Sequence, residues 1–337
     1  MNAFALVCKE YGGPEVLAPD SVELPATGPT QVLVRVEATG VCGHDVADRA
    51  GLTSMPLPLT LGHEIAGTVV ETGAAVRHVQ VGARVACKQH HTCGWCAACR
   101  SGHELDCADK QFVYGGYAEY VLLEEDTLAV VPDGISPAAA AIAACAIGSS
   151  LQAIEAVARL QPGETVAITG AGGGLGLHAL QVASALGARV VAVTSSPAKS
   201  DLLRRHGADE VAIAGEGLAT QLLDLTGGAG VEVVVDNVGL PSLFGGCFKG
   251  LGTRGRYVLT GQLKRERISL FPAFVFFKEA VITGSASTST ASFLRSLDLL
   301  ASGAVTAVTT EYRLADAELA HADVEASRVS GRAVLVP

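Results

Sequence analysis

The sequence predicts an α/β protein with two domains, a mostly antiparallel β region followed by a doubly wound parallel sheet. Short strands with alternating apolar and polar residues, separated by glycine-rich turns, fill the chain before Ser136. From Pro137 onward, near-continuously apolar strands alternate with helical segments, which is typical of a parallel sheet covered by helices on both faces. A length of 337 residues also suits about two domains.

The β region contains four segments that are typical of half-buried strands. We expect strands at 31–38, 64–71, 82–86 and 118–123, because apolar and β-branched residues dominate or alternate there. Glycine-rich turns and Pro132 separate them. The loops between such short strands are long enough to carry functional side chains.

The second region begins with an Ala-rich helical stretch that continues at 148–160. Apolar strands then alternate with helices that carry their apolar residues on one face. The expected helices are 176–186, 198–206 and 218–226, and the expected strands are 165–169, 189–193, 210–213, 231–236 and 255–260. The tail from Thr309 returns to short strand-like pieces.

Composition excludes several classes of protein. Hydrophobic residues make up 49% of the chain and charged residues 17%, which suits a packed core and not a disordered chain. The formal net charge of −10 lacks the basic character of a nucleic-acid binder. No apolar run reaches the ~18 residues that span a bilayer, and the first residues do not resemble a secretion signal. We therefore expect a cytoplasmic protein that acts on a small molecule, without nucleic-acid or membrane partners.

Four of the nine cysteines lie close together with the spacing C-x2-C-x2-C-x7-C. They are Cys93, Cys96, Cys99 and Cys107. Clustered cysteines without an export signal indicate a metal site before they indicate disulfides. Four thiolates saturate a tetrahedral zinc ion and leave no open position, so we expect a structural site. An iron–sulfur cluster is the alternative, since it also uses closely spaced cysteines.

A second possible metal site is dispersed along the chain. Cys42, His63 with the adjacent Glu64, and Cys145 offer two sulfurs, an imidazole and a carboxylate. Two thiolates and one imidazole leave a coordination position open, as a catalytic zinc requires. Spacing alone does not join these residues, because a single Cys or His is more often a buried structural residue.

A glycine-rich loop stands between the expected strand 165–169 and the expected helix 176–186. The loop residues are Gly170, Gly172, Gly173, Gly174, Leu175 and Gly176, in a pattern one residue longer than the strict G-x-G-x-x-G form. Glycines let the backbone approach a pyrophosphate, and a helix N-terminus offers unpaired N–H groups. This placement predicts a dinucleotide site, and a simple tight turn is the alternative.

The residues after the next strand favour NADP(H) over NAD(H). Thr194, Ser195 and Ser196 follow that strand, and Lys199 stands three residues further on. A site for NAD(H) places a carboxylate here for the ribose 2′-hydroxyl, and none is present. Hydroxyls and a lysine suit a 2′-phosphate instead. In the alternative interpretation, the serines only cap the next helix.

With these motifs in order, the sequence resembles the zinc-dependent medium-chain alcohol dehydrogenase family over nearly its whole length. The resemblance rests on the four-cysteine segment, the glycine loop, and the segments 40–45 (GVCGHD), 62–67 (GHEIAG), 115–120 (GGYAEY) and 235–239 (VDNVG). It implies a GroES-like catalytic domain at residues 1–148, completed by 286–337, and a Rossmann dinucleotide-binding domain at 149–285. It also implies a homodimer or homotetramer.

The resemblance assigns roles to individual residues. It implies that Cys42, His63 and Cys145 bind a catalytic zinc, and that Glu64 is a nearby carboxylate able to ligate transiently. Asp45 would support His63, and Val238, in the last of these motifs, would belong to the cofactor site. The four clustered cysteines would hold a structural zinc.

The implied activity is hydride transfer between NADP(H) and an alcohol, aldehyde or ketone. His44 departs from the family pattern, because it stands where members usually carry the Ser or Thr that passes the alcohol proton outward. His44 could itself be the acid and base, since imidazole titrates near neutral pH. The alternatives are a positioning role for His44, reduction of an activated C=C bond with a different proton donor, and a protein that binds NADP(H) without turnover.

The segment 263–277 holds four phenylalanines in a chain in which aromatic residues make up only 5%. They are Phe271, Phe274, Phe276 and Phe277. We expect this segment, together with the loop 49–58 and the surroundings of Trp95, to line the substrate pocket or, for the phenylalanines, a subunit interface. Ordinary packing is the alternative.

Overall fold

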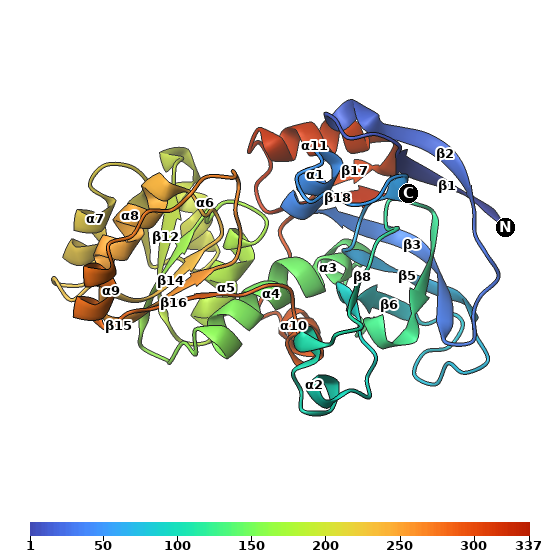
Figure 1. The fold of residues 1–337 in the computed structure, drawn as a ribbon, viewed down its shortest axis with the longest axis horizontal. Coiled ribbons are helices and arrows are strands. Elements are labelled where there is room, and N and C mark those ends of the chain that lie inside the picture. The colour runs from blue at the N-terminus through green and yellow to red at the C-terminus, as the bar shows by residue number, and fades with distance from the viewer. The chain divides into compact units, whose positions relative to one another are not determined.

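The computed structural model describes all 337 residues, which form two compact units (Figure 1). We call the first the β unit, and it contains residues 1–148, 287–303 and 307–337. The second, the α/β unit, contains residues 149–286 and 304–306. The predicted fold class, a mostly β part with a parallel α/β sheet, is confirmed. No helix combines the length and apolar content that crossing a membrane requires.

The main sheet of the β unit joins strands from both ends of the chain. Its central strand β3 pairs antiparallel with β5, β9 and β18. The seven strands are β3 (Gln31–Val41), β5 (Ile65–Thr72), β6 (Arg84–Cys87), β9 (Tyr120–Glu124), β10 (Leu128–Val130), β17 (Thr309–Arg313) and β18 (Arg332–Val336). Alternate residues of β3, including Val32, Val34 and Val36, are buried in one core cluster, as a half-buried strand requires.

Two small sheets and several short helices complete the β unit. The small sheets contain β1 (Asn2–Cys8) with β2 (Leu17–Glu23) and β4 (Leu59–Thr60), and β7 (His90–His91) with β8 (Gln111–Phe112). The helices are α1 (Gly43–Arg49), α2 (Ala97–Arg100), α3 (Pro137–Ala141), α10 (Thr290–Ala301) and α11 (Ala317–Glu325). A π-helical turn at Ala143–Gly148 follows α3.

The α/β unit is a six-stranded parallel sheet with the order β13-β12-β11-β14-β15-β16. The strands are β11 (Thr165–Thr169), β12 (Arg189–Thr194), β13 (Glu210–Ile213), β14 (Val231–Asp236), β15 (Leu251–Leu259) and β16 (Val281–Gly284). The strand order reverses between β11 and β14, and ligands of such sheets bind beyond the carboxyl ends of the strands at this point.

The helices of the α/β unit connect these strands. They are α4 (Ser149–Leu151), α5 (Gly176–Ala185), α6 (Ser200–Arg205), α7 (Leu218–Leu225), α8 (Pro241–Gly250) and α9 (Pro272–Lys278), with a π-helical turn at Gln152–Val157. The central strand β11 is buried along its whole length, which explains why its sequence is continuously apolar apart from its two terminal threonines. The segment expected as one helix at 148–160 is divided between α4 and the π-helical turn.

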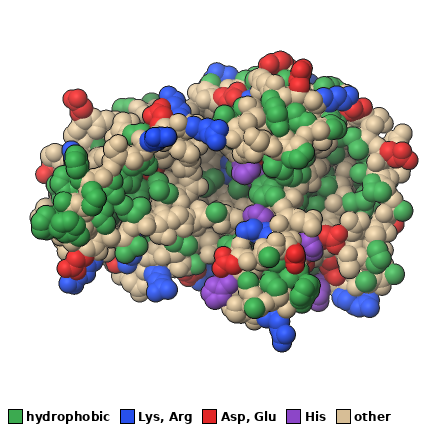
Figure 2. All heavy atoms as spheres, in the orientation of Figure 1, with side chains coloured by type: hydrophobic (Ala, Val, Ile, Leu, Met, Phe, Trp, Pro, Cys, Tyr) green, Lys and Arg blue, Asp and Glu red, His purple; other side chains and the backbone are tan.

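The four phenylalanines of segment 263–277 do not lie in the core. Phe271 and Phe277, on either end of α9, are 72% and 77% exposed, and Phe276 and Phe274 are also exposed. Figure 2 shows a broad hydrophobic patch over the end of the α/β unit where Figure 1 labels α9. The neighbouring strand β16 is an edge of the sheet.

Candidate functional site

Helix α1 places Cys42 and Asp45 at the base of the site in the β unit. Cys42 precedes the first residue of α1 in an extended conformation, so its thiol points across the helix N-terminus. The Asp45 carboxylate accepts a hydrogen bond from the backbone N–H of Cys42 at 2.8 Å, and the Asp45 backbone N–H reaches the Cys42 thiol in return. This reciprocal capping fixes both side chains relative to the helix.

A break in regular helix geometry places Cys145. It lies in the π-helical turn Ala143–Gly148, every residue of which is buried. Within this turn, the N–H of Ile147 bonds to the carbonyl of Ile142. Such single turns occur frequently at functional sites, because the extra residue redirects a side chain.

The structure brings the second set of predicted metal ligands together. The ligand atoms of Cys42, His63, Glu64 and Cys145 all lie within 4.8 Å of one another, and all four residues are buried. Sγ of Cys42 lies 3.8 Å from Sγ of Cys145, which in turn lies 3.7 Å from Nε2 of His63.

These distances fit a single zinc ion. Tetrahedral zinc with Zn–S bonds of about 2.3 Å and Zn–N bonds of about 2.0–2.1 Å separates two sulfurs by about 3.8 Å, and a sulfur from a nitrogen by about 3.6 Å. The observed separations of 3.8 and 3.7 Å match this spacing. The donors Cys42, His63 and Cys145 leave one tetrahedral position open.

Asp45 orients the imidazole of His63. Its Oδ1 lies 3.1 Å from Nδ1 of His63 and also accepts the backbone N–H of Gly62 at 3.2 Å. A proton held on Nδ1 by this carboxylate leaves the lone pair of Nε2 facing the two sulfurs. Burial lowers the pKa of His63, but Asp45 and Cys42 together outweigh it and raise the pKa well above its usual value.

Glu64 lies against the backbone of β3, with Arg332 as its counterion. A Cβ on Gly40 would lie only 2.0 Å from Oε2 of Glu64, so this position requires glycine. Nη2 of Arg332 lies 3.1 Å from Oε1 of Glu64 and 3.9 Å from Sγ of Cys145. Burial raises the pKa of Glu64 to about 7, although Arg332 opposes the shift. Neither carboxylate oxygen has a partner in hydrogen-bond geometry, and Oε2, which lies outside the ion pair with Arg332, is able to accept a ligand.

The two thiols ionise unequally without a metal ion. The Cys145 thiol, Arg332 and His63 lower the pKa of Cys42, whereas Cys42 and burial raise the pKa of Cys145. The Cys42 thiolate therefore forms readily, and its charge opposes the ionisation of Cys145. A divalent cation at this position removes the conflict, because it lets both sulfurs ionise.

His44 stands at the edge of the cluster with a buried carboxylate behind it. Its Nε2 lies 3.4 Å from Oδ1 of Asp48, one helical turn further along α1, and this contact raises the pKa of His44. The OH of Tyr114 donates to the other oxygen of Asp48 at 2.9 Å, and Thr53 also donates to Asp48. The His44 side chain remains 44% exposed.

Phe112 forms an aromatic wall next to these histidines. Its ring is stacked on His44 with a centroid distance of 4.9 Å and lies at the same distance from His63. The His90 ring meets that of Phe112 in an edge-on arrangement with a centroid distance of 5.0 Å, and burial lowers the pKa of His90 to about 4. The Phe112 ring therefore covers part of both imidazoles, and the His44 side chain stays partly exposed.

The four clustered cysteines also form a compact set. Sγ of Cys93 lies 3.9 Å from that of Cys99 and 3.6 Å from that of Cys107, and all four sulfurs lie within 4.8 Å of one another. The backbone N–H of Cys96 points at Sγ of Cys93 at 3.4 Å, as expected near a thiolate. This spacing matches a single tetrahedral ion, whereas the thiolates of a four-iron cluster bind separate irons and lie further apart. The chain thus contains two candidate zinc sites.

The glycine loop of the α/β unit joins β11 to α5. Gly170 has a positive φ of 59°, which favours glycine, and a Cβ on Gly176 would lie 2.2 Å from the carbonyl oxygen of Gly170. Gly172, Gly173, Gly174 and Leu175 complete the turn between them. Val238, after β14, contacts the loop from the next strand, because its Cγ2 lies 2.9 Å from the position of a Cβ on Gly170.

Lys199 extends over the same loop. Its Cδ lies 2.7 Å, and its Nζ 3.5 Å, from the position of a Cβ on Gly172. Thr194 ends β12, and its Oγ1 accepts the backbone N–H of Ser196 at 3.1 Å. Ser196 precedes the short 3-10 helix Pro197–Lys199 without capping it through its side chain. The capping interpretation therefore does not account for Ser196, and Ser195 lies in the same turn.

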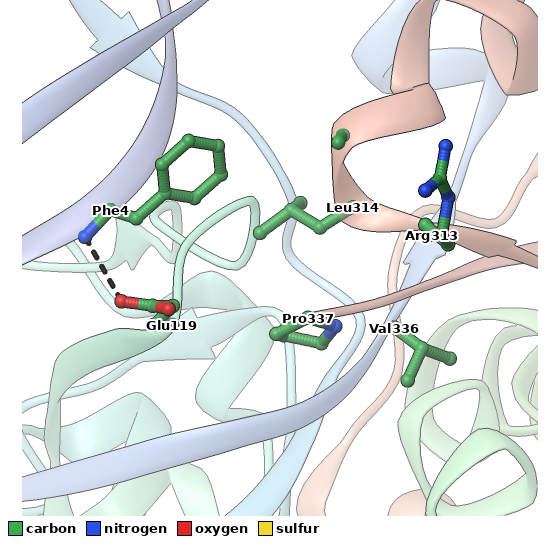
Figure 3. A pocket seen from close by; sticks show the side chains of 7 residues that line it. Phe4, Glu119, Arg313, Leu314, Val336 and Pro337 are labelled. Atoms are coloured by element: carbon green, nitrogen blue, oxygen red, sulfur yellow. Dashed lines mark hydrogen bonds between the residues drawn. The ribbon is translucent and has the colours of Figure 1, made fainter.

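A separate shallow pocket of about 280 Å³ lies on the β unit between β1 and the end of β18 (Figure 3). Its polar groups are already engaged: Oε2 of Glu119 accepts the backbone N–H of Phe4, and Arg313 pairs with Asp316. It contains none of the predicted site residues.

Sequence reasoning missed three residues of the site in the β unit. Arg332 lies on β18 and gives no local signal. Phe112 lies on a two-residue strand that no periodicity reveals. Asp48 could have been found, because residues four apart on a helix face each other.

Comparisons with known proteins agree with this arrangement. Residues 28–133 match the alcohol dehydrogenase GroES-like domain family, and residues 174–302 match the zinc-binding dehydrogenase family. An NAD-dependent alcohol dehydrogenase from Sulfurisphaera tokodaii is 31% identical, with 100% of both chains covered. An acryloyl-coenzyme A reductase from the same organism is 32% identical, with 80% of both chains covered.

A solved structure extends the likeness to three dimensions. The crystal structure of AibC aligns with a TM-score of 0.93 and 38% identity, covering 100% of this chain and 96% of that one. The sequence matches, the fold and the two cysteine-containing ligand sets lead to the same conclusion. The chain belongs to the zinc-containing medium-chain alcohol dehydrogenase family and is an alcohol dehydrogenase-type oxidoreductase.

Proposed function

We propose that this chain transfers a hydride between NADP(H) and a small alcohol, aldehyde or ketone at a catalytic zinc held by Cys42, His63 and Cys145. The observation that carries the proposal is the set of two sulfurs and one imidazole nitrogen at tetrahedral spacing, with one position left open. A zinc ion there supplies a Lewis acid that polarises the substrate oxygen. The nicotinamide ring supplies or accepts the hydride.

The protein groups around this set keep it ready for substrate. Asp45 holds the His63 tautomer in which Nε2 is free to ligate. Glu64 and Arg332 offset each other's charge beside the sulfurs, and Glu64 is close enough to act as a transient extra ligand. The half-buried ring of Phe112 packs against His44 and His63 and limits the access of water to the ligands from that side.

We assign the proton-transfer step to His44. The imidazole lies 5.7 Å from the ring of His63, centroid to centroid, and is partly exposed, so it can exchange a proton between substrate oxygen and solvent. Asp48 stabilises the protonated form, as the raised pKa of His44 reflects. His44→Ala should change the pH–rate profile, whereas Asp48→Asn should shift its midpoint to lower pH. An unchanged profile in both variants would exclude this role.

The cofactor preference rests on Lys199 and its neighbours. The amine extends over the glycine loop, where a 2′-phosphate needs a cation, and Thr194, Ser195 and Ser196 offer hydroxyls nearby. Lys199→Gln should raise the KM for NADPH at least tenfold and leave the KM for NADH nearly unchanged. Equal effects on both cofactors would contradict the assignment.

One experiment tests the function itself. Purified protein is analysed for zinc and assayed with NADPH and NADH on aldehydes, ketones and enals. We expect two zinc ions per chain and turnover of a carbonyl substrate. Cys42→Ser should abolish turnover and leave NADPH binding intact, so a loss of NADPH binding would mean that the site is misplaced.

A second candidate is NADPH-dependent reduction of an activated C=C bond. Two observations favour it: one relative is an acryloyl-coenzyme A reductase, and His44 replaces the usual hydroxyl relay of alcohol oxidation. In that reaction, hydride adds to the β carbon and His44 delivers a proton toward the α carbon. Turnover of an enal or enoyl thioester at C=C, with no turnover of saturated aldehydes, would select this candidate.

We further propose that two copies pair through α9 and β16. Exposed phenylalanines beside an unpaired edge strand form the kind of surface that soluble proteins cover. A two-fold axis lets both edges bond to each other. Phe277→Asp should give a monomer in sedimentation analysis, whereas Leu294→Asp, an exposed control on α10, should not. A dimer that persists in Phe277→Asp would contradict this interface.

A further inference from the structure

An exposed basic loop follows β15 in the α/β unit. Lys264, Arg265 and Arg267 lie within four residues, and all three are exposed. None of them forms an ion pair in the structure. Figure 2 shows Lys and Arg side chains gathered where Figure 1 draws the coil between β15 and α9 in orange.

The loop is anchored at both ends. The backbone N–H of Leu263 donates to the carbonyl of Val238 at 2.9 Å. On the far side, Ile268 and Leu270 pack against the core of the α/β unit. The basic side chains are therefore held at a fixed part of the sheet edge.

The basic loop lies next to the glycine loop and follows a different strand from Lys199. Val238 contacts both Gly170 of the glycine loop and the start of the basic loop. In the strand order, β15 lies three positions from β12, or about 14 Å at about 4.8 Å per strand. The basic loop and Lys199, the residue proposed for the 2′-phosphate, therefore follow strands that are not neighbours in the sheet.

The basic loop lies in the less acidic of the two units. The β unit carries 12 Lys and Arg against 23 Asp and Glu, whereas the α/β unit carries 12 against 11. Three of the 12 basic residues of the α/β unit thus lie in one loop at the ligand-binding edge of its sheet. Glu266 is the one acidic residue among them.

We propose that Lys264, Arg265 and Arg267 bind the phosphate groups of a long substrate tail, and that the substrate is a thioester of coenzyme A. This inference rests on the hydride-transfer function proposed above, in its C=C-reducing form. An exposed loop can hold the far end of a substrate while the reacting end lies elsewhere. The diphosphate and 3′-phosphate of coenzyme A supply several negative charges on such a tail, which suits three cations without internal partners.

The test measures binding to enzyme saturated with NADP⁺, so that the nucleotide site is filled. The probe is S-methyl coenzyme A, because its thioether offers no free thiol to zinc. S-methyl pantetheine, which lacks every phosphate, and inorganic diphosphate are the comparison ligands. The variant Lys264→Gln/Arg265→Gln/Arg267→Gln is compared with a control that removes three exposed cations elsewhere in the same unit, at Arg159, Lys249 and Arg254.

We expect the wild type and the control variant to bind S-methyl coenzyme A at least tenfold more tightly than S-methyl pantetheine. The loop variant should bind S-methyl coenzyme A no more tightly than S-methyl pantetheine, and its affinity for S-methyl coenzyme A should depend little on salt concentration. Its affinity for S-methyl pantetheine should equal that of the wild type. Equal affinity of loop variant and wild type for S-methyl coenzyme A would overturn the proposal. Diphosphate binding as tight as that of the coenzyme would also overturn it, by pointing to a small phosphorylated substrate.

Turnover separates this inference from the proposed function. NADPH-dependent reduction of the pantetheine thioester of acrylate should be the same in the wild type and the loop variant, whereas kcat/KM for acryloyl coenzyme A should fall at least tenfold in the variant. Reduction of both thioesters at unchanged rates would reject the loop and retain the function. Absence of turnover on both thioesters and on all carbonyl compounds would reject the function itself.

Discussion

Replacing Asp45 by Asn tests whether this carboxylate holds the candidate catalytic zinc site together. Asp45 is fully buried and faces three donors: the backbone N–H groups of Cys42 at 2.8 Å and Gly62 at 3.2 Å, and Nδ1 of His63 at 3.1 Å. An Asn amide accepts through one oxygen only and turns an NH₂ group toward the remaining donors. A buried donor left unpaired costs about 1–3 kcal/mol of stability.

The same change should weaken zinc binding. The proton of His63 can move from Nδ1 to Nε2, because Nδ1 then accepts a hydrogen bond from the Asn amide. Nε2 then has no lone pair to offer the metal. Loss of such a supporting group typically lowers metal affinity 10–100-fold, which corresponds to about 1.4–2.7 kcal/mol. The effect should be confined to one of the two metal sites, because the four clustered cysteines make no contact with Asp45 in the hydrogen bonds of the structure.

Competition with a chromogenic chelator measures both sites in one titration. We expect one zinc ion to be released at 10–100-fold lower chelator concentration than in the wild type and the other to be unchanged. Asp316→Asn, which removes an exposed ion pair with Arg313, is the control and should match the wild type. An unchanged titration for Asp45→Asn, or equal weakening of both sites, would refute the reasoning.

Three further predictions follow from other contacts. Arg332→Met should lower the free energy of unfolding of the metal-free protein by about 3–5 kcal/mol, because Glu64 then lacks its buried counterion; a urea titration showing less than about 1 kcal/mol would contradict the ion pair. Burial lowers the pKa of His321 from 6.5 to about 4, so the folded state favours the neutral ring and the unfolded chain takes up the proton first. The resulting stability, up to about 3 kcal/mol, should be complete above pH 6.5 and be lost as the pH falls toward 4, and His321→Gln should flatten that slope in thermal unfolding. Cys99→Ser should remove one zinc ion per chain by metal analysis and leave the second, whereas loss of both would argue against independent sites.

The parallel sheet was predictable because burial on both faces leaves a strong signal. The strand expected at 165–169 is β11 to the residue, since every side chain in it is buried and most are apolar. The first two strands were not predicted. β2 contains Pro19 and alternates irregularly, which an edge strand tolerates because one side of it needs no partner.

The two candidate metal sites differ in how far apart their ligands lie in the sequence, and therefore in how well the sequence predicts them. The four clustered cysteines could be identified by spacing, because one short loop brings their sulfurs together. Cys145 could be joined to Cys42 only through the family resemblance, since the π-helical turn that directs it has no sequence pattern. Arg332 could not be found at all, because the pairing of β18 with β3 brings it to the site.

The pairing of β18 with β3 also sets an order of events during protein synthesis. Arg332 bonds to the carbonyl of Val41, 291 residues earlier in the chain, and the α/β unit is translated between them. The emerging polypeptide therefore carries both thiols and the imidazole well before the strand that completes their sheet and the guanidinium that balances their charge. During that interval the edge of β3 beside the ligands is unpaired, and Glu64 has no guanidinium beside it. A metal ion bound, or a thiol oxidised, at this stage therefore meets a site that lacks both Arg332 and the cover of β18.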